Sequence, residues 1–598
     1  MSLRHALSSG NATITPPTRF RAALDASKRN DVGASPRTRL SRAVLLTLLI
    51  CAAATIRFIL LALEWPASNS DEGTMGLMAM HIAEGRHFPN FMYGQAYMGT
   101  AESYLAAAVF WLFGPSLVAL RVPMVLMFLV FLLVMYVLAS RLYGTRVALV
   151  SVGLLTLGSR ELYGYESVTE GAIPETLLTG GILLLLGHRL LQTAGHSGHS
   201  ARRRWMLAGW GLAVTFGLWS TLLVAPFVLT SGVLLWLARR RHLRLAARGG
   251  GWAMSGGLIV GALPWLAHDL TRPFGETSVA ALIDLYTHGG TGLNGGHSAG
   301  LVSQVTNTVT TSLAYMTGGS AVAHPHSPPA WPLAFSGSWT PPTDNATATV
   351  WGSVLIALWA AGVISALRTL RGRRAALPDE SAHPIAGTAD RRSQQYARLA
   401  MLISAGLTTA AFAASPTAGV APANNVRYLV GILVATPALI APLWALLPAA
   451  PRLARALRLS CLGLVVLTLS AGTVQAFRDA TEGRGEATSR QLIQALQDNG
   501  INRIYAGYFD CGRLTFISRE QLVCAVLFQG PGDSLRPGLD RHLPYRTAVE
   551  ADPRAAYVFR SGDPRNQILA RSTCRWQSHW QLAGYEIWQP AEPCGIAT

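Results

Sequence analysis

Two adjacent carboxylates mark the segment of the chain whose residues are best suited to chemistry. Asp71 and Glu72 stand near the start of residues 70–99, where Ser70 is the expected helix N-cap and Gly85 the expected stop. A positioned carboxylate can take the proton of an attacking hydroxyl. Because successive helical residues point about 100° apart, the two carboxylates are expected to have different tasks. The simpler alternative is an amphipathic helix on a membrane surface, whose acidic first turn only complements the helix dipole.

Groups that suit sugars and phosphates follow these carboxylates along the chain. They are Tyr93, Gln95, Tyr97, Glu102 and Tyr104. Residues 103–113 then predict a helix that is too short to span a membrane. Arg121 and Pro123 begin the apolar run that comes next. The sequence therefore places a polar, acidic segment between two apolar runs.

The elements that must position these residues are membrane helices. Only 13% of the 598 residues are charged and the mean hydropathy is +0.31, which argues against a soluble multidomain enzyme. Most of the apolar runs are close to the ~20 residues that span hydrocarbon. Eleven spans are predicted, at 43–63, 118–138, 147–163, 174–190, 205–220, 221–238, 251–267, 349–367, 398–414, 428–447 and 459–476. The fold class expected is a polytopic α-helical membrane protein.

Arginine sets the predicted orientation. Of the 49 basic residues only Lys28 is a lysine, an arginine-rich bias typical of a high-GC bacterial genome. Basic connections stay cytoplasmic, which places inside the tail 1–42 and the segments 141–146, 202–204, 239–248, 368–398 and 452–458. The outward segments are then 64–117, 164–173, 268–348, 415–427 and everything after 477. Reading 205–238 as one broken span would reverse every later block, so two spans are preferred.

The same clustering of arginine between apolar runs argues against nucleic acid as a partner, despite a net charge of +18. The tail 1–42 has no hydrophobic period and no cleavage site after a short apolar core. It is predicted to be a disordered cytoplasmic tail and not a signal peptide.

Residues 477–598 predict a small extracytoplasmic α/β domain. A helical period at 492–496 stops at Gly500, and strand-like runs follow at 504–508, 522–528, 556–559 and 585–588. Four cysteines lie in this region: Cys511, Cys524, Cys574 and Cys594. An oxidising compartment favours two disulfides. The simplest pairing joins Cys511 to Cys524 and Cys574 to Cys594, although four cysteines permit three pairings.

Several short motifs occur together in the first part of the chain. They are the Asp-Glu pair after the first span, a Tyr-containing short helix ending in Phe-Gly, an Arg-x-Pro start to the next span, and Arg-Leu-Tyr-Gly at 141–144. In this order they resemble the GT-C glycosyltransferases, and within them the protein O-mannosyltransferases and lipid A aminoarabinose transferases. The resemblance to these families covers residues 50–240 and is seen again at residues 425–429. It implies a GT-C-type transmembrane domain over 43–476.

The resemblance implies an enzyme that moves a sugar from a polyprenyl-phosphate donor to an acceptor hydroxyl at the outer membrane face. Asp71 would be the general base, with Glu72 in support. Arg427 and Tyr428 match a pair that many GT-C enzymes carry near the lipid phosphate, where a guanidinium fork suits phosphate oxygens. The alternative for this pair is an interfacial anchor.

Other substrate-binding residues are expected in the outward loops. They are Tyr93, Gln95, Glu102, Glu166 and Glu170. The two glutamates lie where related enzymes place a second acidic residue, although Glu161 and Glu175 are alternatives and a solvated loop is the simpler interpretation for each. Arg57, inside the first span, is a further candidate to pair with a first-loop carboxylate.

No cofactor is predicted from the sequence. The loop 268–348 contains His288, His297, His324 and His326, but their spacing fits no compact metal motif. A divalent metal stays open as an alternative, and a loop that covers the acceptor is favoured. The expected partners are the lipid-linked sugar donor, a glycan, lipid or protein acceptor, and the lipids of a bacterial plasma membrane.

Two functions from other classes compete with a transferase. A transporter or flippase of a lipid-linked saccharide would gather polar groups near the bilayer midplane on broken helices. This chain gathers them in outward loops. A non-catalytic protein that anchors a sensing domain would leave Asp71 and Glu72 without a shared pocket.

Overall fold

The structure is a computed structural model, and it describes residues 36–171, 173–193, 200–241, 250–288, 300–323, 346–371, 388–445, 451–483, 485–532 and 534–594. Residues 50–598 form one compact unit, and residues 1–49 belong to a separate one. The first helix of the described residues, α2 (Pro36–Ala62), begins within the predicted tail 1–42. Positions 1–35 and the predicted loop residues His297, His324 and His326 lie outside the described residues.

Most of the predicted spans are single helices, as their unbroken apolar runs require. Besides α2 they are α5 (Leu117–Tyr143), α8 (Ile173–Thr193), α9 (Ser200–Ser220), α10 (Ala225–Arg241), α11 (Gly250–Asp269), α17 (Ala346–Leu370), α18 (Thr388–Ala413) and α22 (Pro451–Glu482). Trp210 of α9 donates a hydrogen bond to Ser231 of α10 at 3.1 Å, so the chain turns back between these helices. Residues 205–238 are therefore two helices.

Two predicted spans are broken. Residues 147–163 divide into α6 (Thr145–Thr156) and α7 (Arg160–Ser167), because Ser159 caps α7 by accepting from the Leu162 amide. Residues 428–447 divide into a 3₁₀ segment, η7 (Val426–Ala435), and the short helices α20 (Thr436–Ile440) and α21 (Pro442–Ala445). Pro437 and Pro442 stand at the starts of these short helices, where a proline is tolerated.

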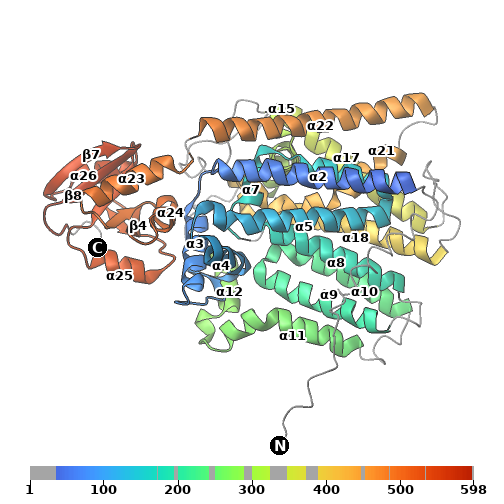
Figure 1. Ribbon diagram of the computed structural model, residues 1–598, viewed down its shortest axis with the longest axis horizontal. Coiled ribbons are helices and arrows are strands. Elements are labelled where there is room, and N and C mark those ends of the chain that lie inside the picture. Colours follow the sequence, from blue (N-terminus) through green and yellow to red (C-terminus); the bar gives the residue numbers. More distant parts are fainter. Residues whose placement is uncertain are drawn as a thin grey trace, which may run out of the picture. The chain divides into compact units, whose positions relative to one another are not determined.

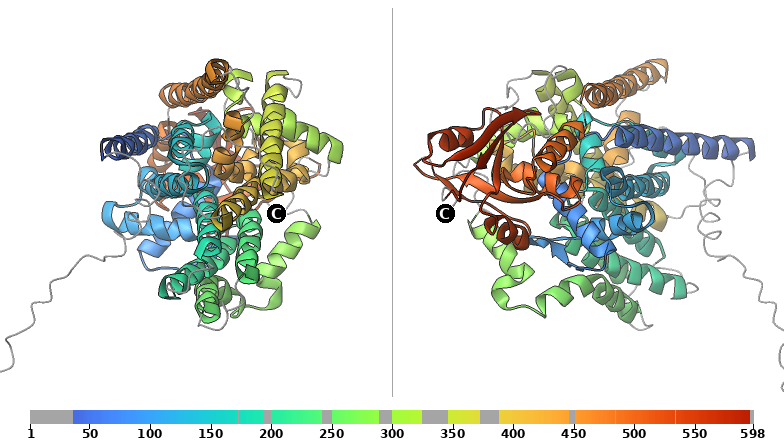
Figure 2. Two further views of the ribbon diagram at one scale, coloured as in Figure 1. Left: turned by 90° about the vertical axis from the view of Figure 1, so that its right-hand side faces the viewer. Right: turned by 60° about the vertical axis from the view of Figure 1, so that its left-hand side comes forward.

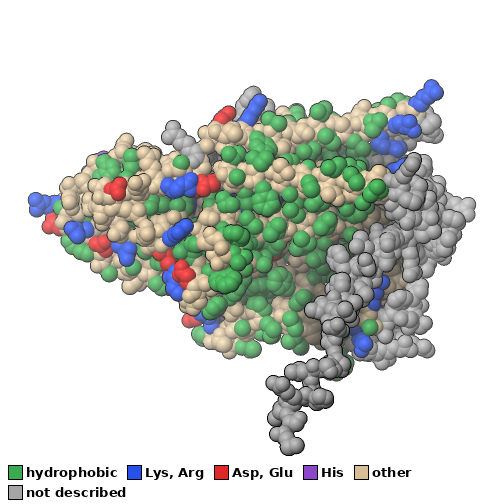
Figure 3. All heavy atoms as spheres, in the orientation of Figure 1, with side chains coloured by type: hydrophobic (Ala, Val, Ile, Leu, Met, Phe, Trp, Pro, Cys, Tyr) green, Lys and Arg blue, Asp and Glu red, His purple; other side chains and the backbone are tan. Residues whose placement is uncertain are grey.

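The long helices present an apolar surface. Six of the described helical runs, in α2, α5, α10, α17, α18 and α22, are long and apolar enough to cross a membrane. Large side chains such as Leu126 of α5 and Leu467 of α22 are exposed, and hydrophobic side chains cover much of the surface over the helices (Figure 3). Exposed apolar surface of this extent is typical of contact with lipid. The chain is a multi-pass membrane protein, while the span count and the orientation stay predictions.

The segment after α2 folds into two helices and a hairpin. It contains α3 (Ser70–Ala83), a hairpin of β1 (Phe91–Met92) and β2 (Gln95–Gly99), and α4 (Ala101–Phe113). The N-cap of α3 is Asn69 and not Ser70, because the Asn69 side chain accepts from the Glu72 amide. Most side chains of α3 are buried. The interpretation of α3 as a helix lying on a membrane surface is therefore wrong.

Shorter elements connect the remaining long helices. They are η2 (Leu222–Val224), η4 (Phe274–Glu276), α12 (Ser278–His288), α13 (Leu301–Asn307), η5 (Thr308–Ser312), α14 (Leu313–Thr317), α15 (Ser320–Ala323) and α19 (Pro416–Val420).

The C-terminal domain has the predicted α/β fold. Its sheet has the order β5-β4-β3-β6-β8-β7, in which β3 is parallel to β4 and β6. The strands are β3 (Arg503–Ala506), β4 (Val523–Gln529), β5 (Leu535–Pro537), β6 (Ala556–Arg560), β7 (Trp576–Leu582) and β8 (Tyr585–Pro590). Helices α23 (Ala487–Asp498) and α24 (Tyr508–Ile517) pack on one face. Helices α25 (Leu543–Glu550) and α26 (Pro564–Arg571) pack on the other.

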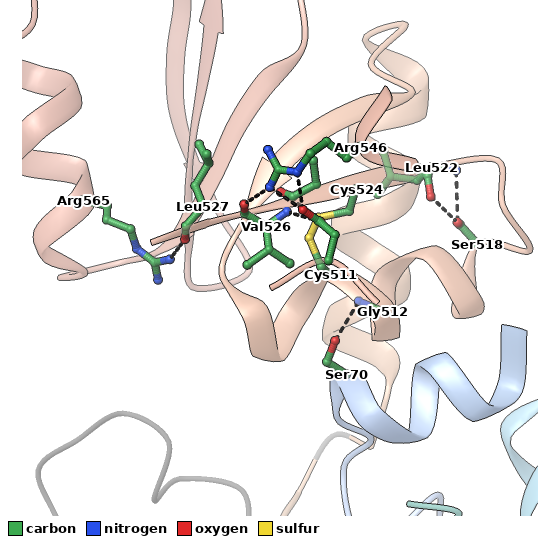
Figure 4. Close-up of a disulfide and its surroundings, with 12 residues drawn as sticks. Ser70, Cys511, Gly512, Ser518, Leu522, Cys524, Val526, Leu527, Arg546 and Arg565 are labelled. Atoms are coloured by element: carbon green, nitrogen blue, oxygen red, sulfur yellow. Dashed lines mark hydrogen bonds and ion pairs between the residues drawn. A yellow bond between two sulfur atoms is a disulfide. The ribbon is translucent and has the colours of Figure 1, made fainter. Parts of the chain in front are cut away.

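Two disulfides close this domain with the simplest predicted pairing, Cys511 with Cys524 and Cys574 with Cys594. The first joins α24 to strand β4, as Figure 4 shows. In the same view the amide of Gly512 reaches the Ser70 hydroxyl at 3.0 Å. The disulfide thus fixes the helix that meets α3.

Glycines let α24 and α3 approach closely. A Cβ on Gly73 would lie 2.4 Å from the Arg513 backbone nitrogen, and one on Gly512 would lie 2.5 Å from the Ser70 carbonyl oxygen. Both distances are too short for a side chain, so only glycine fits. The domain, drawn in orange to red in Figure 1 and brought forward on the right of Figure 2, consequently lies against the blue α3.

We expect Gly73→Ala and Gly512→Ala to force α3 and α24 apart. Overpacking typically costs about 1–3 kcal/mol, which exceeds the gain of about 1 kcal/mol from replacing a helical glycine. The thermal midpoint of the purified protein should fall in both variants. Gly463→Ala in α22 is the matched control, because an added Cβ there meets no atom within 4 Å. An unchanged midpoint in Gly73→Ala would contradict the close contact.

Candidate active site

Asp71 is a partly exposed carboxylate that the C-terminal domain contacts. The Tyr508 hydroxyl donates to Asp71 Oδ1 at 2.5 Å, and the Arg541 guanidinium donates to the same oxygen at 3.0 Å. Arg541 also donates to the Tyr508 hydroxyl. The Asp71 side chain remains 27% exposed. Among the residues that the structure describes, no group donates to Asp71 Oδ2.

Arg541 links this carboxylate to the hairpin. With its amide oxygen turned toward the guanidinium, Gln95 accepts from both terminal nitrogens of Arg541 at 2.9 Å and from the Tyr97 hydroxyl at 3.1 Å. Burial raises the pKa of Tyr97, so its hydroxyl stays protonated and can donate. One arginine therefore connects α3, β2 and α24.

A second carboxylate lies close to Asp71. Glu170 accepts from the Asn69 amide at 2.9 Å and from Arg427 at 3.0 Å. Arg427 also donates to the Tyr428 hydroxyl at 3.3 Å. Burial raises the pKa of Glu170 to about 7 against the effect of Arg427, and the charge of Asp71 adds to the rise. Near neutral pH this glutamate can exchange its proton.

Glu72 has a different environment from its neighbour. Both of its oxygens accept from Arg121 at 2.7 Å, and one also accepts from the Thr169 amide at 3.1 Å. The two charged side chains are fully buried. Glu72 therefore holds α3 against α5 and the loop after α7, and it does not face the exposed side of Asp71.

Three other predicted residues bond to groups other than Asp71. Tyr93 bonds to His81 at 2.8 Å and to His87 at 2.9 Å. Glu102 accepts from the Gly171 amide at 3.0 Å, and Glu166 forms a buried pair with Arg57 at 2.6 Å. Arg57 thus pairs with a carboxylate of α7 and not with one of the first loop.

The structure therefore brings together Asp71, Gln95, Glu170, Arg427 and Tyr428 from the predicted set. Sequence reasoning missed Asn69, Tyr508 and Arg541. The last two stand in a domain distant in sequence, and no local pattern marks them. Asn69 could have been found as an N-cap, because asparagine is among the preferred cap residues.

The arrangement can move a proton and bind an anion. Asp71 Oδ2 is open to accept a proton, and Arg427 is a cation that can stabilise negative charge on phosphate. Within the described part of the chain, no group of three or more His, Cys, Asp or Glu residues is placed to hold a metal ion.

Comparisons with known proteins rest on the fold, because no protein-family model and no curated sequence matches the chain. The chain is similar to the crystal structure of ArnT from Cupriavidus metallidurans bound to undecaprenyl phosphate. The TM-score is 0.52 and the identity 14%, over 92% of this chain and 98% of that one. ArnT in its apo state gives a TM-score of 0.51 over the same shares. The chain has the GT-C fold.

A further similar structure is that of an archaeal protein. The oligosaccharyltransferase AglB from Archaeoglobus fulgidus, in complex with an inhibitory peptide and a dolichol-phosphate, has 13% identity and a TM-score of 0.46, over 88% of this chain and 70% of its own. The similarity to ArnT confirms the predicted resemblance to GT-C proteins at the level of the fold.

Loss of the charge on Glu72 should lower the stability of the protein. Glu72→Gln leaves the buried Arg121 without its partner, which costs about 3–5 kcal/mol. Removing both charges, in Glu72→Leu with Arg121→Met, should restore most of that stability. Unfolding in detergent, followed by tryptophan fluorescence, measures the three proteins. Equal stability of Glu72→Gln and the unaltered protein would contradict the structural role.

Proposed function

We propose that the protein is a membrane glycosyltransferase that moves a sugar from a polyprenyl-phosphate donor to an acceptor hydroxyl. The observation that carries the proposal is the placement of an open carboxylate oxygen, on Asp71, beside the Glu170–Arg427 pair in a GT-C fold. The crystal structure of ArnT with undecaprenyl phosphate supports a lipid phosphate as the donor's leaving group.

In the proposed reaction Asp71 Oδ2 takes the proton of the acceptor hydroxyl. The acceptor oxygen forms a bond to the anomeric carbon as the bond between that carbon and the phosphate oxygen breaks. The electron pair of the broken bond stays on the lipid phosphate, whose growing negative charge Arg427 stabilises. The proton passes from Asp71 to solvent after the product leaves. The products are the glycosylated acceptor and the polyprenyl phosphate.

Glu170 tunes Arg427 in this proposal. When Glu170 is ionised it competes with the donor phosphate for the guanidinium. When it is protonated, more of the positive charge of Arg427 is available to the donor. The pKa of about 7 places this change in the physiological range.

The site is proposed to face the outer side of the membrane. It lies at the helix ends that carry the C-terminal domain, and the arginine-rich connections predict that this end is extracytoplasmic. The position also disfavours a transporter, since the cluster is built from α3, the hairpin, the loop after α7 and the start of η7. A transporter is expected to bind near the bilayer midplane.

Asp71→Asn tests the base. Asparagine keeps the size of the side chain, and its amide oxygen can still accept from Tyr508 and Arg541, but it cannot take a proton. Transfer from a polyprenyl-phosphate sugar should fall by about 100-fold or more. Donor binding should be unchanged, and the thermal midpoint should fall less than in Glu72→Gln, because the Asp71 side chain is 27% exposed. Radiolabelled donor and chromatography of the product measure the rate, with and without a chelator, because a divalent metal is an open alternative. Near-normal transfer by Asp71→Asn would exclude it as the base.

The affinity for the donor should depend on pH through Glu170. A sugar phosphodiester keeps one negative charge between pH 6 and 8, whereas Glu170 loses its proton over this range. We expect the dissociation constant to rise severalfold, up to about tenfold, from pH 6 to 8, because ionised Glu170 competes for Arg427. Glu170→Gln should remove this dependence and keep tight binding at pH 8. The same slope in both proteins would assign the pH effect to another group.

A further inference from the structure

We propose that Arg541 of the C-terminal domain is a positioning residue for Asp71, which holds one carboxylate oxygen so that the other faces the acceptor. This inference rests on the proposed function, and it gives the C-terminal domain a direct part in the site. Tyr508 of the same domain assists Arg541.

Arg541 is itself held in place from two sides. The segment before it is bound to β4, because the Gly538 amide donates to the Val526 carbonyl at 2.8 Å and Asp540 accepts from the Val526 amide at 2.8 Å. The Cα of Arg541 lies 3.4 Å from the position that a Cβ on Gly94 would occupy, at the turn of the hairpin. The Arg541 side chain is only 7% exposed. A buried guanidinium with fixed surroundings has little freedom to choose another partner.

The contacts of Arg541 divide the two oxygens of Asp71. Oδ1 accepts from both Tyr508 and Arg541. In the described residues Oδ2 accepts from neither, and the side chain keeps 27% of its surface exposed. A carboxylate held by one oxygen cannot rotate freely, so the second oxygen keeps a fixed direction. Holding a catalytic group in the geometry that the reaction requires can contribute much of an enzyme's rate acceleration.

Tyr508 strengthens the same arrangement. Burial raises the pKa of its hydroxyl well above the usual range, so the hydroxyl keeps its proton and donates to Asp71. Tyr508 is the first residue of α24, the helix that meets α3 through Gly512 and that Cys511 ties to β4. The packing of α24 against α3 therefore also places Tyr508 next to Asp71.

Four variants test the inference in the full-length protein: Arg541→Gln, Arg541→Lys, Tyr508→Phe and Arg490→Gln. Arg490 is the matched control, because it joins the same domain to Glu64 with contacts of 2.7 and 3.0 Å but does not touch Asp71. Arg541→Gln should lower kcat by about 10- to 100-fold with an unchanged KM for the donor. Arg541→Lys should recover part of the loss, since the ammonium keeps the charge but not the fork. Tyr508→Phe should cost less than Arg541→Gln, and Arg490→Gln should leave kcat unchanged.

A second measurement reports the contact without activity. A water-soluble carbodiimide modifies accessible carboxylates, and peptide mass spectrometry gives the rate at Asp71. That rate should rise in Arg541→Gln and stay unchanged in Arg490→Gln. An equal fall of kcat in Arg541→Gln and Arg490→Gln would overturn the inference, because it would show that general docking of the domain is what matters. A faster rate of transfer in Arg541→Gln would also overturn it, since Arg541 would then restrain Asp71.

The outcomes separate this inference from the proposed function. If the unaltered protein transfers sugar, Asp71→Asn abolishes transfer and Arg541→Gln retains kcat and the labelling rate, the inference fails and the function stands. If the unaltered protein transfers no sugar from lipid-phosphate donors, the proposed function fails. The labelling rate then decides alone whether Arg541 positions Asp71, and an unchanged rate in Arg541→Gln overturns that role.

Discussion

The close contact between α3 and α24 is the constraint on which the site depends. Gly73 and Gly512 leave the two backbones in direct contact, and the Ser70 hydroxyl accepts from the Gly512 amide across the interface. A larger residue at either glycine would separate the helices. Because Tyr508 and Arg541 reach Asp71 only from the docked domain, the surroundings of the carboxylate are a product of this packing.

Adjacent carboxylates in one helical turn have separate roles, as their angular spacing requires. Glu72 points into the protein and meets Arg121 with two oxygens, whereas Asp71 points to the side where the domain docks. Burying an ion pair costs desolvation free energy, and removing one partner costs more because the other charge is left buried without a partner. Glu72 and Arg121 therefore keep α3 in one orientation, and that orientation determines where Asp71 stands. Glu72 thus influences the position of Asp71 although, within the described segments, the two side chains have no partner in common.

Arginine is the recurrent partner of carboxylates around the site. Arg541 pairs with Asp71, Arg427 with Glu170, Arg121 with Glu72 and Arg57 with Glu166. The planar guanidinium donates in two directions at once, so each arginine can satisfy a carboxylate and still reach a second group. For Arg541 the second groups are Tyr508 and Gln95, and for Arg427 a second group is Tyr428. Each of these arginines therefore neutralises a carboxylate and also links the segment that carries the carboxylate to another element.

Features that depend on local pattern could be predicted from the sequence. Apolar length predicted the membrane helices, strand-like runs and a stopped helix predicted the α/β domain, and the order of short motifs predicted the GT-C fold. The prediction from sequence was wrong where competing local signals were nearly equal, as at the N-cap of α3, where Asn69 and not Ser70 accepts from the helix. The broken helices at 147–163 and 428–447 look like continuous spans because hydropathy does not register a cap or a proline turn.

Which of the polar residues form the site depends on the packing of distant segments. Tyr93, Glu102 and Glu166 have the same residue types as the members of the cluster, but their side chains bond elsewhere. Arg541 lies 470 positions from Asp71 in the sequence, and no periodicity relates residues so far apart. Their meeting depends on glycine contacts, a disulfide and the fold of a second domain. Local sequence specifies what each residue can do, and packing selects the residues that act together, because chemistry requires a few ångströms of distance that only the folded chain provides.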